Sequence, residues 1–306
     1  MIKKQLTRLS VAALTALVFA GTVHAEDPAR TVMAYLKIGI DARAAALGDA
    51  FVSVADNASA NYWNPAGLLS IESMDATFMH NEWLLDLRHE YAGVGFRSGR
   101  HAGGVAFVGM FTGDLDRRSE TGEDEGTFGF SDNAFSGSYA FQVSDDLGLG
   151  ITARYLRETI NEYVMSGVAF DFGGLWNTPI EHLTAGAALR NVGGELSFDV
   201  DDAGSYELPT TLQAGANYVM SDVGPGALLV AADMVVVSGE DNSLRMGAEY
   251  TYDNYLSLGV GYKSGLDNED MSVGIGYTKD VRFHYAFIPL DQDLGSSHRI
   301  SLGYAW

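Results

Sequence analysis

The residues that could carry out acid–base or metal chemistry are scattered along this chain. Six histidines follow residue 25, and none lies three or four positions from another. The sequence lacks the zinc motif HExxH, the nucleophile motif GxSxG and the phosphate-binding P-loop. It also lacks cysteine, which excludes disulfides, thiolate catalysis and a lipid anchor on cysteine. The sequence therefore predicts that the protein is not an enzyme, with no catalytic residues, no metal site and no cofactor.

One acidic segment could bind a cation. Residues 114–126 contain six carboxylates, and carboxylate oxygens are ligands for Ca²⁺. Their spacing differs from that of an EF-hand loop. We predict a solvated outer loop here, with a Ca²⁺ site as the alternative.

A second set of charged residues occurs one at a time, among small residues, in segments where apolar and polar residues alternate. Alternate side chains of a strand point to opposite faces, and a Lys or Arg on the lipid face of a membrane barrel costs about 2–4 kcal/mol at the midplane. We therefore predict that these charges face a barrel lumen. They either pair with one another and with a plug, or form a binding or gating cluster. The set is Asp171, Arg190, Asp233, Arg245, Glu249 and Arg282.

The elements that must position these charges are alternating strands. No run after residue 25 is apolar over the 20 or so residues that a transmembrane helix needs. Short and longer connections alternate along the chain, as in an up-and-down barrel with short periplasmic turns and longer outer loops. A soluble β-sandwich is the alternative, but it requires no such asymmetry. The fold class predicted is all-β: a transmembrane up-and-down antiparallel β-barrel of about 14 strands. The candidate strands lie near 73–82, 88–98, 101–113, 128–143, 147–160, 164–177, 181–191, 208–220, 226–238, 242–252, 254–264, 270–279, 281–290 and 297–306.

The end of the chain supports this architecture. Ile300, Leu302, Tyr304 and Trp306 share one face of the last strand, while the residues between them are small or polar. Such an ending resembles the C-terminal assembly signal of outer-membrane barrels, with its terminal aromatic residue. We therefore predict that Leu302, Tyr304 and Trp306 are read by the barrel assembly machinery and then face outer-membrane lipid.

The start of the chain indicates export. Residues 1–25 combine a basic stretch, an apolar stretch and small residues before Glu26, as in a cleaved signal peptide. The predicted location is the cell outer membrane of a Gram-negative-type bacterium. The net charge is −21, and because like charge repels phosphate, we exclude a nucleic-acid partner.

Residues 26–71 precede the barrel, predicted over 72–306, and do not alternate. An alanine-rich, helix-compatible stretch follows Asp41, a candidate N-cap. A barrel of about fourteen strands is wider than its wall side chains can fill, so we predict that this segment folds inside as a hatch. Arg43 is expected to pair with Asp171, Asp233 or Glu249. The predicted hatch or gating residues are Arg43, Asn64, Pro65, Ala66 and Gly67.

The run from Gly39 to Leu68 resembles the N-terminus of PorV/PorQ-family proteins, which belong to the wider FadL-like superfamily of fourteen-stranded barrels. The resemblance rests on Arg43-Ala44, Gly48, Ala50-Phe51, Ala55-Asp56 and the sequence YWNPAGL at Tyr62–Leu68. The final hairpin, from Tyr285 to Leu302, resembles the closing hairpin of the same family. In FadL-like fatty-acid channels an Asn-Pro-Ala element belongs to the hatch, and the resemblance implies the same role for Asn64 to Ala66.

The resemblance implies two functions of different classes. The first is an accessory of type IX-like protein secretion, which handles the C-terminal domains of secreted cargo or helps attach cargo at the outer membrane. The second is a FadL-like channel that takes up a hydrophobic small molecule and releases it through a lateral opening controlled by the hatch. Co-purification with cargo would favour the first function, and bound lipid would favour the second.

Overall fold

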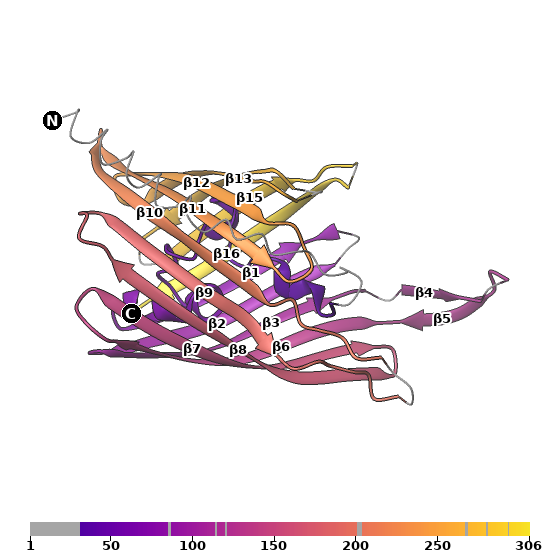
Figure 1. Ribbon diagram of the computed structural model, residues 1–306. Coiled ribbons are helices and arrows are strands. Elements are labelled where there is room, and N and C mark those ends of the chain that lie inside the picture. Colours follow the sequence, from indigo (N-terminus) through magenta and orange to yellow (C-terminus); the bar gives the residue numbers. More distant parts are fainter. Residues whose placement is uncertain are drawn as a thin grey trace.

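The barrel closes as its sequence pattern predicts. The computed structural model describes residues 31–306 except 85–86, 114, 120, 201–203, 267–268, 280 and 293, so the predicted signal peptide lies outside the described residues. Within these residues, fourteen antiparallel strands form a closed barrel, in which β1 pairs with β16 (Figure 1). Each barrel strand lies within three residues of its predicted bounds. The strands are β1 (Met74–Glu82), β2 (Arg88–Ser98), β3 (His101–Phe111), β6 (Phe130–Gln142), β7 (Leu147–Ile160), β8 (Tyr163–Asn177), β9 (Leu183–Gly193), β10 (Thr211–Val223), β11 (Gly226–Val237), β12 (Ser243–Tyr252), β13 (Leu256–Lys263), β14 (Met271–Thr278), β15 (Val281–Pro289) and β16 (Ser296–Ala305).

Large apolar side chains cover the outside of the barrel. Leu258 of β13 is 62% exposed and pairs in register with Ile275 of β14, which is 54% exposed. Gly259 and Gly274, next to them in the chain, are buried on the inner side. This alternation gives lipid an apolar surface and leaves a thin inner wall. No helix in the described part of the chain is long and apolar enough to cross a membrane.

The two ends of the barrel differ. One, here called the tight-turn end, holds the connections 99–100, 143–146, 178–182, 224–225 and 253–255, the start of β1 and the end of β16. The opposite, long-loop end holds most of the longer connections, although β7 and β8 join there through residues 161–162 alone. The predicted acidic loop contains a separate hairpin, β4 (Leu115–Arg118) and β5 (Asp124–Phe128), which extends beyond the barrel in Figure 1.

The described part of the predicted hatch, residues 31–71, lies inside the barrel, where Figure 1 draws it in indigo. It contains the 3-10 helix η3 (Ala34–Lys37), the helices α2 (Ala42–Ala46) and α3 (Ala60–Trp63), and the 3-10 helix η4 (Pro65–Ser70). At the long-loop end, Thr31 forms a parallel bridge with Glu207 and Lys37 pairs with Glu240. The segment then runs through the lumen and joins β1 at the tight-turn end. Helix α2 packs against β13–β16, and η4 packs against β6–β8.

Candidate functional site

Local sequence shapes the hatch. The carboxylate of Asp41 accepts a hydrogen bond from the backbone N–H of Arg43 and caps α2, as the sequence predicts. Gly48 ends this helical turn at a φ of 61°, which glycine adopts without strain. Alanines fill the faces of α2, so its backbone lies close to the wall: a Cβ at Gly259 would lie 2.9 Å from that of Ala46.

The Asn-Pro-Ala turn is bound to the wall. The Asn64 side chain donates to the carbonyl of Val52 at 2.8 Å and to that of Gly174 in β8 at 3.1 Å, and it accepts from the N–H of Ala66 at 3.2 Å. Pro65 follows at the first position of η4, where its fixed φ suits a helix start. Gly67 is buried beneath the carbonyl of Ala55. The four predicted residues Asn64 to Gly67 therefore form one buried turn of the hatch.

Arg43 connects the hatch to the wall. Its guanidinium contacts the carboxylate of Glu249 in β12 at 2.8–3.1 Å and that of Asp56 at 3.0–3.1 Å. Burial by itself lowers the pKa of Arg43, but Glu249 and Asp56 outweigh it and raise the pKa above its ordinary value. Of the three partners that the sequence suggests for Arg43, the structure places Glu249 against it.

Asp49 is the anionic centre of the hatch, and sequence reasoning missed it. Its carboxylate lies 2.6 Å from Nζ of Lys263, 3.6 Å from Arg299 and 4.0 Å from Arg245. Burial raises the pKa of Asp49, but Lys263, Arg299 and Arg245 outweigh it and hold the pKa well below its ordinary value. The available signal was a single acid within an apolar alanine-rich stretch.

Two more of the predicted lumenal charges contact the hatch directly. Asp233 accepts the N–H of Val52 at 3.0 Å. The guanidinium of Arg190 lies 5.0 Å from the ring centroid of Tyr62 and 5.2 Å from that of Trp63, within the range of cation–π attraction. Together with Glu249 and Arg245, these charges hold the hatch from several sides.

Asp171 and Arg282 instead pair within the wall. Asp171 binds Arg154 and accepts the backbone N–H of Asn191 at 2.7 Å. This contact lies where the register between β8 and β9 shifts, and Asn191 has a φ of 59°. Arg282 pairs with Asp75 of β1 at 2.6 Å. All six predicted charges point inward, and four of them contact the part of the hatch that the structure describes.

The predicted assembly residues lie on the outer face. Leu302, Tyr304 and Trp306 are each about half exposed. The N–H of Met74 donates to the carbonyl of Trp306 at 3.0 Å, and the N–H of Trp306 donates to the carbonyl of Met74 at 3.1 Å. The last residue therefore completes the ladder that closes the barrel. Their exposure places them where lipid would contact the wall.

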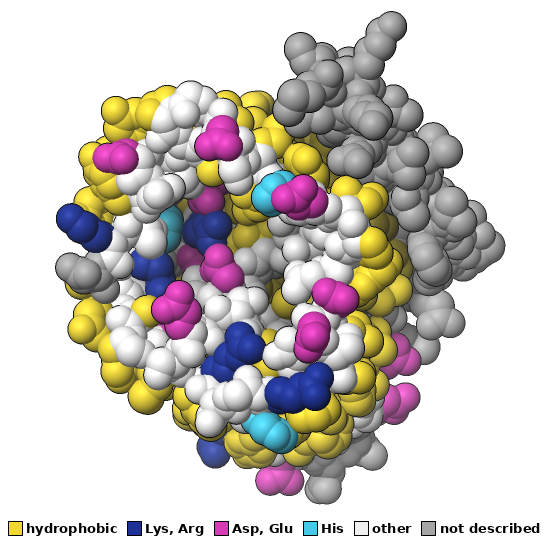
Figure 2. Space-filling model, turned by 90° about the vertical axis from the view of Figure 1, so that its left-hand side faces the viewer, with side chains coloured by type: hydrophobic (Ala, Val, Ile, Leu, Met, Phe, Trp, Pro, Cys, Tyr) yellow, Lys and Arg dark blue, Asp and Glu magenta, His cyan; other side chains and the backbone are white. Residues whose placement is uncertain are grey.

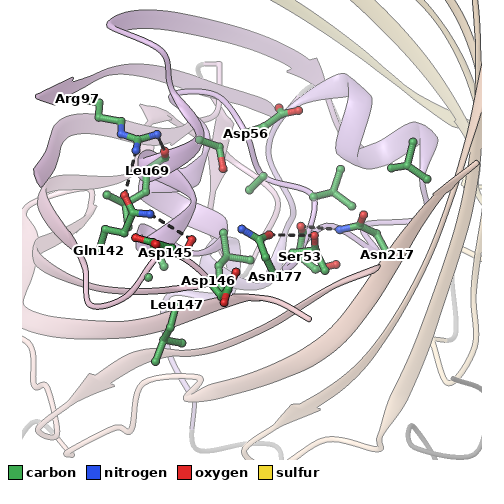
Figure 3. A pocket seen from close by; sticks show the side chains of 18 of the residues that line it. Ser53, Asp56, Leu69, Arg97, Gln142, Asp145, Asp146, Leu147, Asn177 and Asn217 are labelled. Atoms are coloured by element: carbon green, nitrogen blue, oxygen red, sulfur yellow. Dashed lines mark hydrogen bonds between the residues drawn. The ribbon is translucent and has the colours of Figure 1, made fainter. Parts of the chain in front are cut away.

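A hollow of about 300 Å³ opens at the tight-turn end, between the hatch and strands β6–β11. Figure 2 shows this end: charged and other polar side chains surround the recess, and apolar side chains lie around the outer surface of the barrel. The close view in Figure 3 places Ser53 and Asn217 on one side of the hollow and Arg97, Gln142 and Asp145 on the other. Among the described residues, no group of three or more His, Cys, Asp or Glu side chains is arranged to hold a metal ion.

Comparisons with known proteins address the family and the fold. Residues 121–304 match the family model described as "Type IX secretion system membrane protein PorP/SprF". The CymD monoaromatic hydrocarbon channel has a TM-score of 0.62 at 15% identity, over 88% of this chain and 98% of that one. The Ralstonia pickettii toluene transporter TbuX has a TM-score of 0.59 at 14% identity, with the same coverage. A Pseudomonas aeruginosa FadL homologue has a TM-score of 0.54 at 13% identity, over 92% and 99%. At such identities the likeness shows the fold alone, and no curated protein matches the sequence.

Proposed function

Because this chain belongs to the PorP/SprF family of type IX secretion system membrane proteins, we propose that it is a non-enzymatic accessory of protein secretion at the outer membrane. It handles secreted cargo, or helps attach cargo at the surface, from a barrel whose lumen stays closed. Its partners are outer-membrane lipid, the barrel assembly machinery and the C-terminal domains of cargo.

The observation that carries this proposal is the way the hatch is held. Arg43 binds β12, Asp49 binds cations of β12, β13 and β16, and Asn64 binds β8. These contacts surround the segment, and most are buried. Removing one member of a buried ion pair costs about 3–5 kcal/mol, so opening a pore would break several strong contacts together. A barrel closed in this way acts through its two ends rather than through its lumen.

The resemblance of residues 39–68 to PorV/PorQ proteins supports the cargo-handling part of the proposal. The PorP/SprF match begins at residue 121, so the two likenesses rest largely on different parts of the chain. We keep PorV/PorQ-like cargo handling as the finer proposal within the secretion role.

The proposal is tested in the native host. Deleting the gene should leave cargo in the periplasm, and a plasmid copy of the full chain should restore cargo to the cell surface. A pull-down from the outer membrane through a tag in the β4–β5 hairpin should recover cargo C-terminal domains. Normal surface cargo in the deletion strain would contradict the secretion role.

The alternative is a channel for hydrophobic small molecules. The fold of hydrocarbon channels supports it, and so does the register shift between Phe170 and Phe172, a local irregularity in the pairing of β8 with β9. Uptake of a monoaromatic hydrocarbon by the same deletion and complemented strains distinguishes the two functions. A defect in uptake with normal surface cargo would favour the channel.

A further inference from the structure

A shallow hollow, here called the outer hollow, lies on the outside of the barrel wall near the long-loop end. Its volume is about 440 Å³, within the range of ligand sites. Arg88, Phe111, Ser131 and Thr159 line it, and they pair in register across β2, β3, β6 and β7. Side chains an even number of residues apart in a strand share a face. By this rule the row lies on the same face as four exposed apolar side chains of these strands: Phe96, Val105, Phe135 and Tyr155.

The outer hollow lies just beyond the apolar band of the wall. Outward aromatic side chains form an in-register row across β3, β6 and β7: Phe107, Phe135 and Tyr155. Such aromatic girdles mark the level where hydrocarbon gives way to headgroups. Thr159 lies four residues beyond Tyr155 on β7, an advance of about 10 Å along the membrane normal for a tilted strand. Because long loops of outer-membrane barrels face the cell exterior, the outer hollow lies at the level of the outer-leaflet headgroups.

The height of the apolar band supports this level. The outward apolar side chains of β7 and β8 begin near the tight-turn end at the pair of Leu147 and Trp176, of which Trp176 is 48% exposed. From Leu147 to Tyr155 the strand advances eight residues, or about 21 Å along the membrane normal. The apolar band of such barrels is about 25 Å tall, so Tyr155 lies close to its outer edge.

Two arginines lie on this outward surface without a partner. Arg88 lines the outer hollow, and Arg157 of β7 lies between Asn133 and Ser166 in register, one outward position below Thr159. Both arginines are exposed, and among the described residues neither guanidinium forms a hydrogen bond or an ion pair. A charge on the lipid face is costly at the membrane midplane but not near the interface, where an anionic headgroup can neutralise it.

The neighbouring acids leave these arginines available. The outward acids of β1 and β2, Glu82 and Glu90, lie 4.0 Å and 2.7 Å from His80. Glu162, in the turn that follows β7, is exposed and does not line the outer hollow. A guanidinium group binds phosphate through two parallel hydrogen bonds. Two such groups at headgroup level therefore favour a phosphorylated ligand.

The spacing of the arginines indicates which headgroup fits. Strands β2 and β7 are three strand spacings apart in the wall, or about 14 Å, so a headgroup with a phosphate at either end can pair with both arginines. Between them, Ser131 and Thr159 line the outer hollow, and their hydroxyls can bond to the oxygen atoms of a sugar. Beneath the hollow, the rings of Phe107 and Phe135, with centroids 5.0 Å apart, offer an apolar surface to acyl chains.

We propose that the outer hollow binds the headgroup of a glycolipid that carries two phosphates and belongs to the outer leaflet of the outer membrane. Arg88 and Arg157 pair with the phosphates, the hydroxyls of Ser131 and Thr159 bond to the sugar, and the acyl chains lie along the aromatic row. This site goes beyond the secretion role and does not depend on it.

Native mass spectrometry of the full chain in dodecyl maltoside tests the proposal. The probes are diphosphoryl lipid A, the same lipid without its phosphates, and inorganic pyrophosphate as a soluble source of the same groups. One molecule of diphosphoryl lipid A should bind per chain, about tenfold more tightly than the dephosphorylated lipid. Equal binding of the two lipids would overturn the proposal. Pyrophosphate that binds as tightly as diphosphoryl lipid A would overturn the assignment to a lipid.

Matched variants separate the outer hollow from the general charge of this end. Arg88→Gln and Arg157→Gln should each weaken binding of diphosphoryl lipid A about threefold, and the double variant about tenfold, because exposed ion pairs contribute modestly and distant ones add. The control Arg118→Gln removes the same charge from the β4–β5 hairpin, outside the hollow, and should bind as the wild type does.

Undiminished binding in the double variant would overturn the proposal, and so would an equal loss in Arg118→Gln and the two single variants. Each variant is first checked for a folded barrel by its shifted mobility on an unboiled gel.

Discussion

Adding one methyl group to the wall should loosen the hatch. Gly150 of β7 lies beneath the Asn-Pro-Ala turn, and a Cβ built there would lie 2.6 Å from the backbone N of Ala66 and 2.6 Å from the carbonyl carbon of Pro65. These are backbone atoms, so no side chain can rotate away. Overpacking of this kind costs about 1–3 kcal/mol. We expect Gly150→Ala to displace the turn.

The displacement follows from comparing two free energies. Asn64 holds the turn with three hydrogen bonds, each contributing about 0.5–1.5 kcal/mol, or about 1.5–4.5 kcal/mol together. The methyl group at Gly150 therefore offsets much of what Asn64 contributes. Hydrogen bonding between β7 and its neighbours remains available to alanine, and so the barrel itself should assemble normally.

The assay combines abundance with pore opening. Wild-type protein and Gly150→Ala should reach the outer membrane in equal amounts and show the same heat-dependent mobility on gels. In planar bilayers, the wild-type protein should remain closed and Gly150→Ala should show intermittent conductance. The hatch of the variant should also be cut faster by a protease added from the tight-turn end.

A matched control is Gly137→Ala in β6. A Cβ at Gly137 meets nothing within 4 Å, so this variant should behave as wild type. If Gly150→Ala stays as closed and as protease-resistant as Gly137→Ala, the hatch is not held by close contact with the wall. If Gly150→Ala fails to assemble, the turn is a folding element and cannot act as a separable plug.

Four further predictions concern the hatch and the last strand. Asn64→Ala and Arg43→Ala should leave outer-membrane abundance unchanged while altering cargo secretion or uptake, measured in the same cells; loss of assembly in both would show that the segment is needed for folding. Asp49→Asn should destabilise the hatch by about 3–5 kcal/mol, because Lys263 and its neighbouring arginines keep their buried charge; unchanged protease protection would contradict this. Those cations hold the pKa of Asp49 below its value in the unfolded chain, about 3.9. The stability that Asp49 adds to the hatch is therefore complete above about pH 4 and is lost as the pH falls further. Protection of the hatch against protease, measured from pH 7 to pH 3, should decrease in the same way. Deleting residues 304–306 removes the closing contacts with Met74 and should leave the chain unassembled in the periplasm, where normal outer-membrane levels would refute the role of the terminal aromatic face.

The secretion family was only partly foreseen from the sequence. The Asn-Pro-Ala turn and the closing hairpin suggested a PorV/PorQ-like protein, whereas the family model that matches is PorP/SprF. Both are secretion-associated outer-membrane barrels, which short motifs at the chain ends cannot distinguish. The strand-rich body is poor in distinctive motifs because its pattern is set by lipid on one side and the lumen on the other.

The acidic segment shows a limit of pattern reading. Its described side chains are mostly exposed, in keeping with the predicted solvated outer loop, but the sequence pattern does not indicate that β4 and β5 pair there as a hairpin. Exposed residues lie on both of its faces, so no apolar alternation marks it. Pairing of this kind depends on a turn and on backbone hydrogen bonds, such as that from Ser119 N–H to the carbonyl of Glu123, which leave little trace in hydropathy.

The sequence alone determined the barrel, its strands, their outer faces and the inward direction of the six charges. Each of these follows from a local rule, because neighbouring side chains of a strand alternate and only apolar groups tolerate lipid. The tertiary structure alone decided which charges meet. Arg43 and Glu249 are 206 positions apart, and Asp49 and Lys263 are 214 apart. Such pairs depend on strand register and on the depth of the hatch, which are set by how the whole barrel closes around it.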